Sequence, residues 1–294
     1  MENFSSNIMQ CVITGIMMGS VYALIAFGFN ITSGIVRVTN FSHGMFVVTG
    51  MFLTITLCTA LAIDPYLALV LTLPICFIIG AVVEKVFVHP ILNAPKINQF
   101  ILTLALKIFL ENCLLFFYGG DFRGLTTWYT SKSIIFESIN VSINYSQLFA
   151  FIATALGLFG ITYLLYFSRL GKQMRAVADD KEAAALLGTN VWSVYTIAFG
   201  LAALLAAISG AASISYMVVA PADGNAIVIK AFIVTIFGGP GSILGTILGG
   251  LFLGLLENIG VLIVGPSMAT AFALLGMIIF ILARPQGLLG KKIN

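Results

Sequence analysis

The sequence is poor in charge and in the residues that carry enzymatic chemistry. Only 9% of its 294 residues are Asp, Glu, Lys or Arg, and histidine occurs twice, at His43 and His89. With so few titratable groups, we find no Ser, His and Asp arrangement and no cluster with the spacing of metal ligands. The sequence argues against an enzyme and against a bound metal, and the net charge of +3 gives no reason to expect a nucleic-acid partner.

Two further signatures are missing. The four cysteines, Cys11, Cys58, Cys76 and Cys113, lie in apolar runs and form no C-x-x-C pair, which favours small packing residues over disulfides or metal ligands. No G-x-x-x-x-G-K-[ST] loop occurs, because GLLGKK near the carboxyl end has a different spacing and lacks the final Ser or Thr. We therefore expect the chain to bind no cofactor, and any ATP hydrolysis to occur on a partner.

The sequence is rich in long runs of apolar residues. Hydrophobic residues make up 60% of the chain and the mean hydropathy is +1.09. About 20 apolar residues suffice to cross a bilayer as a helix, so the chain has room for about eight or nine transmembrane helices, some short or broken. We predict an all-α polytopic membrane protein with one transmembrane domain over residues 1–294. The expected spans are 8–30, 43–62, 66–88, 99–118, 147–168, 191–219, a broken pair at 226–237 and 242–258, and 267–283.

The basic residues predict an orientation. Residues 169–190 form the most charged stretch of the chain and must face water. If this stretch is cytoplasmic, most basic residues fall on the same side, as the positive-inside rule requires, with the amino terminus outside and the carboxyl terminus in the cytoplasm. The longest external loop is then 119–146. The basic residues expected inside are Arg37, Lys85, Lys96, Arg169, Lys172, Arg175, Lys181, Arg284, Lys291 and Lys292.

Within the charged stretch, one short motif suggests a docking helix. Glu182, Ala183 and Ala184 are followed, after three intervening residues, by Gly188. Small side chains allow two backbones to approach closely, and the glycine allows the chain to leave the helix sharply. The motif resembles the EAA loop of ABC importer permeases, a cytoplasmic helix that docks on the ATPase subunit. We expect a short surface helix here that couples the chain to an ATPase.

Two apolar runs are interrupted by Gly and polar residues, at Ser33–Gly44 and at Phe237–Ser242. Broken segments in the two halves of a transporter indicate a solute pathway, because they present unpaired backbone ends. A tight cytoplasmic turn is the alternative for each segment. It accounts for the second segment equally well, but in the first it would not need Asn40 and His43 at the mouth of a span. The candidate pathway residues are Asn40, Ser42, His43, Gly238, Gly239, Gly241 and Ser242.

Three longer signatures extend the resemblance. Gly19–Gly44, Lys230–Glu257 and the ARPQGLLGKK segment at Ala283–Lys292 are similar, in this order, to segments of the branched-chain amino acid ABC importer permease family. The chain departs from the family's N-F-A-H-G core at Ser42, which stands in place of Ala. It departs again at Met45, where an acidic residue is frequent.

This resemblance implies an integral subunit of a bacterial cytoplasmic-membrane importer. Its partners would be a second permease subunit, two cytoplasmic ABC ATPases that carry ATP and Mg²⁺, a periplasmic or lipid-anchored solute-binding protein, and membrane lipid. The solute would be a branched-chain or other hydrophobic amino acid, moved by alternating access. Urea or a short amide is the alternative solute. A secondary transporter or channel is the alternative class. An ion-driven carrier should place several acidic residues in the middle of the membrane, and the sequence places only Glu111 and Glu257 there, which argues against this class.

Charges inside the expected spans require partners. Lys107 and Glu111 are four residues apart and share a helix face, so we expect them to neutralise each other. Lys230 and Glu257 match positions of the resembled family, and a salt link between them is a hypothesis. A row of glycines in the last signature predicts close helix packing; these are Gly241, Gly245, Gly249, Gly250 and Gly254.

Overall fold

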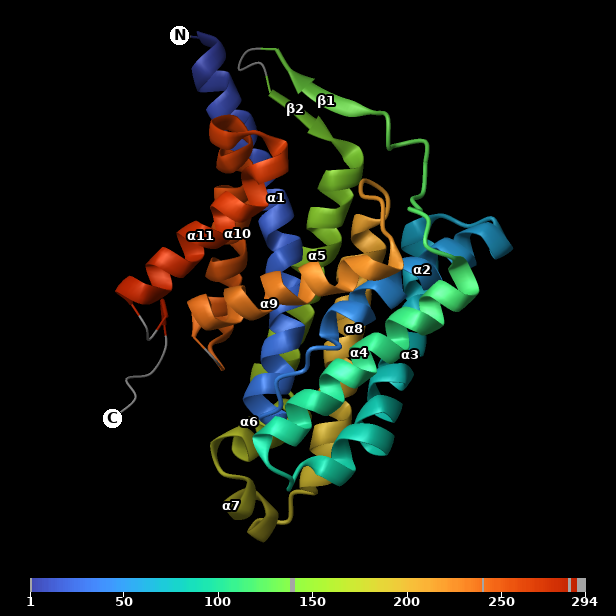
Figure 1. Ribbon diagram of the computed structural model, residues 1–294, viewed down its shortest axis with the longest axis vertical. Helices are drawn as coiled ribbons and strands as arrows, with labels where there is room; N and C mark the ends of the chain where they lie inside the picture. The colour runs from blue at the N-terminus through green and yellow to red at the C-terminus, as the bar shows by residue number, and fades with distance from the viewer. Residues whose placement is uncertain (1, 138–140, 240, 285–286, 290–294) are drawn as a thin grey trace.

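The computed structural model describes residues 2–137, 141–239, 241–284 and 287–289, with side chains from residue 6 onward. Within these ranges it is mostly helical (Figure 1). The helices are α1 Glu2–Ile31, α2 His43–Leu61, α3 Pro65–Val83, α4 Lys96–Tyr118, α5 Tyr145–Phe167, α6 Arg169–Asp179, α7 Lys181–Leu186, α8 Val191–Ser213, α9 Gly224–Gly238, α10 Ile243–Val264 and α11 Pro266–Ala283. Short π turns at Thr32–Val36 and Glu84–Val88 and 3-10 turns at His89–Ile91 and Pro221–Asp223 join them.

The described residues contain nine helices that are long and apolar enough to cross a membrane, which confirms the expected polytopic helical fold. The break between α9 and α10 is also confirmed, although Pro240 lies outside the described residues. The predicted end of the second member of this pair, at residue 258, is wrong, because α10 continues to Val264. Glu257 lies inside the helix, where it pairs with Lys230, and the helix ends only at Gly265, whose φ is 83°.

Polar residues at the helix starts explain where the chain turns. The Asp64 side chain accepts a hydrogen bond from the Tyr66 N–H and begins α3. Asn144 and Asn190 do the same for α5 and α8, and Ser242 for α10. Each supplies an acceptor to one of the free N–H groups of the first turn. The starts of these four helices therefore follow from single capping residues between apolar runs.

Helix α1 runs through the middle of the molecule and packs closely on α10 (Figure 1). A Cβ atom on Gly250 would lie 2.4 Å from the Ala23 Cα, and one on Gly254 would lie 2.3 Å from the Gly15 carbonyl oxygen. Gly249 instead faces α9, where a Cβ would lie 3.0 Å from the Val234 carbonyl oxygen. The predicted glycine packing is confirmed for Gly245, Gly249, Gly250 and Gly254, and it serves two neighbouring helices rather than one. It is wrong for Gly241, which precedes α10 and where a Cβ would meet nothing within 4 Å.

The outer helices present apolar side chains to the surroundings. α3, α4, α5 and α11 carry large hydrophobic residues that stay exposed, as expected where lipid rather than protein covers a helix. Examples are Leu67, Val70, Ile101, Ile108, Phe109, Phe116, Phe159 and Leu282.

The loop 119–146 contains a feature that the sequence did not predict. Strands β1 Ser133–Phe136 and β2 Val141–Asn144 form an antiparallel pair at the same end of the molecule as the amino terminus (Figure 1). Gln10 of α1 exchanges two hydrogen bonds with the Ser142 backbone, both 2.8 Å long. The strands are too short to give a clear alternating pattern, and this contact with α1 supplies a partner that local sequence does not reveal. Helices α6 and α7 lie at the opposite end (Figure 1).

Candidate functional site

The segment between α1 and α2 returns into the interior of the bundle. Arg37 adopts the left-handed conformation, with φ of 61°, and ends the π turn that follows α1. Helix α2 then begins at His43, which is fully buried, and its Nε2 lies 2.9 Å from the Ile25 carbonyl oxygen, well inside α1. Irregular backbone at such a depth is tolerated where protein encloses it or where it lines a water-filled cavity.

Asn40 and Ser42 shape this helix start. The Asn40 Oδ1 accepts hydrogen bonds from the Ser42 N–H, at 3.1 Å, and from the Ser42 hydroxyl, at 2.6 Å. Asn40 and Ser42 are fully buried. Asn40 Nδ2 and His43 Nδ1 find no hydrogen-bond partner among the described residues. The three predicted pathway residues thus lie together, yet they line none of the cavities described below.

The second interrupted segment is fastened to α1 by Asn30. Gly239 and Gly241 have φ of 93° and 78°, which only glycine adopts without strain. The Asn30 Oδ1 accepts a hydrogen bond from the Gly241 N–H, at 2.8 Å, and its Nδ2 donates to the Thr246 hydroxyl, at 2.7 Å. Gly238 is buried against α10, where a Cβ would lie 2.4 Å from the Gly245 carbonyl carbon.

A cavity of about 310 Å³ lies next to Asn30, and we call it the Asn30 cavity. It reaches from α1 to the carboxyl-terminal half of α5 and to α6. Two predicted pathway residues, Gly241 and Ser242, line it. Its lining residues include Asn30, Gly34, Ile35, Leu165, Arg175, Ala178, Gly241 and Ser242.

The predicted charged pairs are both within contact distance. Lys230 Nζ lies 2.8 Å from Glu257 Oε1 and donates to the Tyr22 hydroxyl at 3.1 Å, so the link joins α9, α10 and α1. The Thr270 hydroxyl also donates to Glu257. In α4, Lys107 Nζ lies 3.7 Å from Glu111 Oε2.

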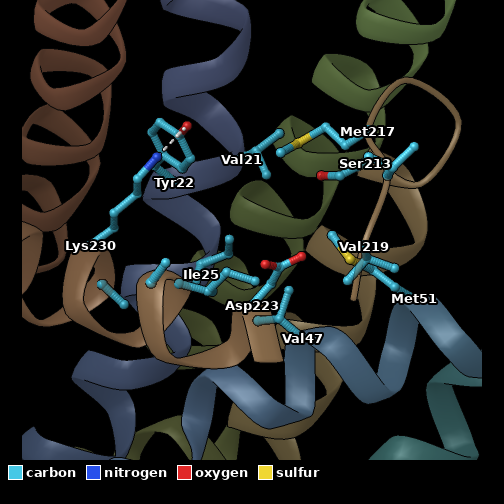
Figure 2. A pocket seen from close by; sticks show the side chains of 14 residues that line it. Val21, Tyr22, Ile25, Val47, Met51, Ser213, Met217, Val219, Asp223 and Lys230 are labelled. Atoms are coloured by element: carbon cyan, nitrogen blue, oxygen red, sulfur yellow. Dashed lines mark hydrogen bonds between the residues drawn. The ribbon is translucent and has the colours of Figure 1, made fainter. Parts of the chain in front are cut away.

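A second cavity, of about 250 Å³, lies where α1, α2, α9 and the end of α8 meet, and we call it the Asp223 cavity (Figure 2). Of the predicted site residues, only Lys230 lines it. Figure 2 shows Tyr22 and Lys230 on one side of the cavity and the Asp223 carboxylate pointing into the cavity. Most of the remaining wall is apolar, formed by Val21, Ile25, Val47, Met51, Met217, Val218, Val219, Ala226, Ile227 and Ala231.

The charged stretch 169–190 forms two helices. The short surface helix expected at the Glu182 motif is α7, whereas α6 before it was not expected as a separate helix. Asp180 adopts an extended conformation, with φ of −148°, that separates α6 from α7. Its Oδ1 accepts hydrogen bonds from the Glu182 N–H, at 2.8 Å, and the Ala183 N–H, at 3.1 Å. Hydrogen bonding to the Ala183 and Glu182 amides lowers the pKa of the Asp180 carboxyl below its usual value of 3.8.

The motif residues of α7 differ in burial. Ala184 is buried, whereas Glu182 and Ala183 are exposed. Gly188 has φ of 85°, and its N–H donates to the Ala185 carbonyl, which ends the helix as expected. Leu186 and Leu187 are 90% and 86% exposed at the tip, so α7 presents an apolar pair to its surroundings.

Most of the chain matches one family of transport permeases. Residues 11–283 match the family described as branched-chain amino acid transport system / permease component. The chain belongs to this family. It is a multi-pass protein of the cytoplasmic membrane.

Individual permeases of the family align over nearly the whole chain. This permease is 32% identical to the high-affinity branched-chain amino acid transport system permease protein BraD of Pseudomonas aeruginosa, over 96% of each chain. It is 30% identical to LivH of Escherichia coli K12, again over 96% of each chain. It is 26% identical to a probable branched-chain amino acid transport permease protein LivH of Methanocaldococcus jannaschii, over 94% of this chain and 90% of that one.

Sequence reasoning missed several polar residues of this permease. Asn30 and Tyr22 stood unremarked within the first apolar run, and Asp223 in the turn before α9. Glu84 is fully buried, where it accepts a hydrogen bond from Thr196. The polarity of Asn30 and Glu84 inside apolar runs was the available signal, since such residues need a partner. The predicted tail signature is only partly described, because Pro285, Gly290, Lys291 and Lys292 lie outside the described residues.

Proposed function

We propose that this permease is a membrane-spanning subunit of an ATP-driven ABC importer for branched-chain amino acids, and that it works by alternating access. The observation that carries the proposal is the match to the permease family over residues 11–283. The relatives' names describe high-affinity branched-chain amino acid transport. The partners would be a second permease, two ATPases and a solute-binding protein.

The surface around α7 supports docking of an ATPase. Leu186 and Leu187 are almost fully exposed at the tip of α7. They belong to the stretch 169–190, which is the most charged part of the chain. Apolar side chains in such a position gain stability when a partner covers them. We assign this end to the cytoplasm, which leaves the amino terminus and the β1–β2 hairpin outside.

Hydrogen bonds connect this docking surface to the interior of the bundle. The Arg37 side chain donates to the carbonyl oxygen of Ala178 at the end of α6, at 2.9 Å. Lys96 of α4 donates to the Arg37 carbonyl oxygen, at 3.0 Å. Residue 37 begins the segment that leads to Asn40, Ser42 and His43. Displacement of α6 and α7 by an ATPase would therefore act on the buried start of α2.

The two cavities support a pathway with a barrier between them. The Asp223 cavity borders Val21, Tyr22 and Ile25 of α1 and the end of α8. The Asn30 cavity borders the carboxyl-terminal end of α1, together with α6. We assign the barrier to the buried start of α2 and to the Gly238–Ser242 turn, and the two cavities would open to opposite sides in turn. The apolar wall of the Asp223 cavity favours an aliphatic solute over urea or a short amide.

Affinity purification from mild detergent tests this function. Wild type should retain an ATPase subunit and a second permease, whereas Glu182→Arg should lose the ATPase, because it reverses an exposed charge on α7. Glu137→Arg is the matched control, since Glu137 is exposed in the loop at the opposite end. If the wild-type chain purifies alone under conditions that preserve other ABC complexes, the importer proposal is wrong.

A further inference from the structure

The Asp223 cavity combines an apolar wall with a charge that has no counter-ion. Asp223 Oδ2 accepts a hydrogen bond from the Ala220 N–H, at 2.8 Å. In the described part of the chain, no Lys or Arg forms an ion pair with Asp223. The carboxylate points into the cavity (Figure 2). Asp223 is half-buried, so its carboxylate loses part of its hydration, and a cationic group placed beside it offsets that cost.

The side of the cavity opposite Asp223 carries no net charge. Lys230 is a cation there, but Glu257 neutralises it at 2.8 Å. The Tyr22 hydroxyl accepts a hydrogen bond from Lys230, and Tyr22 lines the same cavity. The lining as a whole therefore carries one uncompensated negative charge at Asp223 and a neutral, polar end at Tyr22 and Lys230.

We propose that the Asp223 cavity is a transit site for a free α-amino acid with an aliphatic side chain. The Asp223 carboxylate receives the α-ammonium group. The solute carboxylate lies toward the Tyr22 hydroxyl and the Lys230 ammonium, and the aliphatic side chain contacts Ile25, Val47 and Met51. This assignment rests on the proposed import function and adds to it the residues that hold the solute inside the membrane.

The arrangement also excludes other small solutes. A sugar would place many hydroxyl groups against a wall with few hydrogen-bond partners, and each group left unpaired would weaken binding. A carboxylic acid without an ammonium group would meet the Asp223 carboxylate with no compensating cation. The cavity thus selects for an ammonium group combined with an apolar side chain.

Leucine uptake by proteoliposomes tests the site. The vesicles hold the complex that co-purifies with this chain, together with its solute-binding protein, and ATP is supplied on the ATPase side. Asp223→Asn keeps an acceptor for the Ala220 N–H but removes the charge. We expect uptake to fall about tenfold or more, because a hydrogen bond to a charged group is lost, while the subunit composition of the complex stays unchanged. A purely structural role for Asp223 predicts wild-type uptake in Asp223→Asn, and that result would overturn the proposal.

A second pair of variants tests the cavity without touching a charge. Met51→Trp places a larger side chain in the wall of the cavity, and we expect it to reduce leucine uptake strongly. Met268→Trp is the control, because Met268 is 61% exposed on α11, away from the cavity, and its uptake should match wild type. Normal uptake by Met51→Trp contradicts the transit site. If the wild-type complex itself shows no ATP-dependent uptake, the import function fails, which is a different outcome from failure of the site.

Discussion

Gly44 and Gly224 meet backbone to backbone at the crossing of α2 and α9. A Cβ atom on Gly44 would lie 2.0 Å from the Gly224 carbonyl oxygen. Because the atom in the way belongs to the backbone, no side-chain rotation can relieve the contact. This crossing brings the buried start of α2 next to the helix that carries Lys230.

The first prediction concerns this crossing. Gly44→Ala should lower the thermal stability of the purified permease in detergent, since overpacking of a close contact costs about 1–3 kcal/mol or more. Gly160→Ala is the matched control, because a Cβ at Gly160 of α5 would meet nothing within 4 Å. Equal melting temperatures for the two variants would contradict the close crossing.

The Lys230 and Glu257 pair gives the second prediction. Lys230→Met leaves the Glu257 carboxylate without its cation, and Glu257→Met leaves the ammonium without its anion. Each single variant should lose about 3 kcal/mol or more of folding stability. The double variant should be more stable than either single variant, since no isolated charge remains. The measurement is chemical or thermal unfolding in detergent, and a double variant no better than the worse single one would show that the two residues do not act as a pair.

The third prediction concerns pH and the cap of α7. The amides of Ala183 and Glu182 hold the pKa of the Asp180 carboxyl below its ordinary value in the folded chain. A lowered folded pKa means that the cap contributes its full stability above the unfolded pKa and loses it as pH falls through the folded pKa. Amide hydrogen exchange in α7 should therefore be slower in wild type than in Asp180→Ala at pH 7.

The difference between these two proteins should disappear in acid, once Asp180 is protonated. Asp180→Asn is the control for acceptor geometry, because Asn is also a good N-cap residue and should keep the protection at both pH values. Equal exchange of wild type and Asp180→Ala at pH 7 would mean that the cap does not hold α7.

The exposed leucines of α7 give the fourth prediction. Replacing Leu186 and Leu187 with Ser should weaken association with the ATPase, because apolar residues at the centre of an interface contribute most to binding. The melting temperature of the isolated permease should not change, since both side chains are almost fully exposed. Retention of the ATPase at wild-type levels by the double variant would place the interface elsewhere.

The sequence predicted the membrane spans because the thickness of the bilayer sets the number of consecutive apolar residues that a spanning helix needs, and such runs are visible in the sequence. It also predicted the glycine contacts, since Gly250 and Gly254 recur at helical spacing. It placed His43 at the mouth of a span, whereas the structure places it beside Ile25 inside the bundle. Nothing in the local pattern distinguishes a turn at the surface from one that returns into the interior.

The cavity residues were harder to predict, since they come from distant segments. Tyr22 and Lys230 are 208 residues apart and meet through a hydrogen bond and a cation–π contact. Asp223 belongs to a short turn whose composition is typical of any loop. Only the packing of α1 against α9 and α2 brings these side chains around one space, and that packing is a tertiary property.

ATP-driven leucine accumulation by the purified complex tests the central claim most directly. Proteoliposomes that contain this permease with its co-purifying partners and solute-binding protein should concentrate leucine only when ATP is hydrolysed. Omission of the solute-binding protein should abolish the accumulation. Leucine accumulation driven by a proton or sodium gradient, with the ATPases absent, would contradict the account and identify the chain as a secondary transporter.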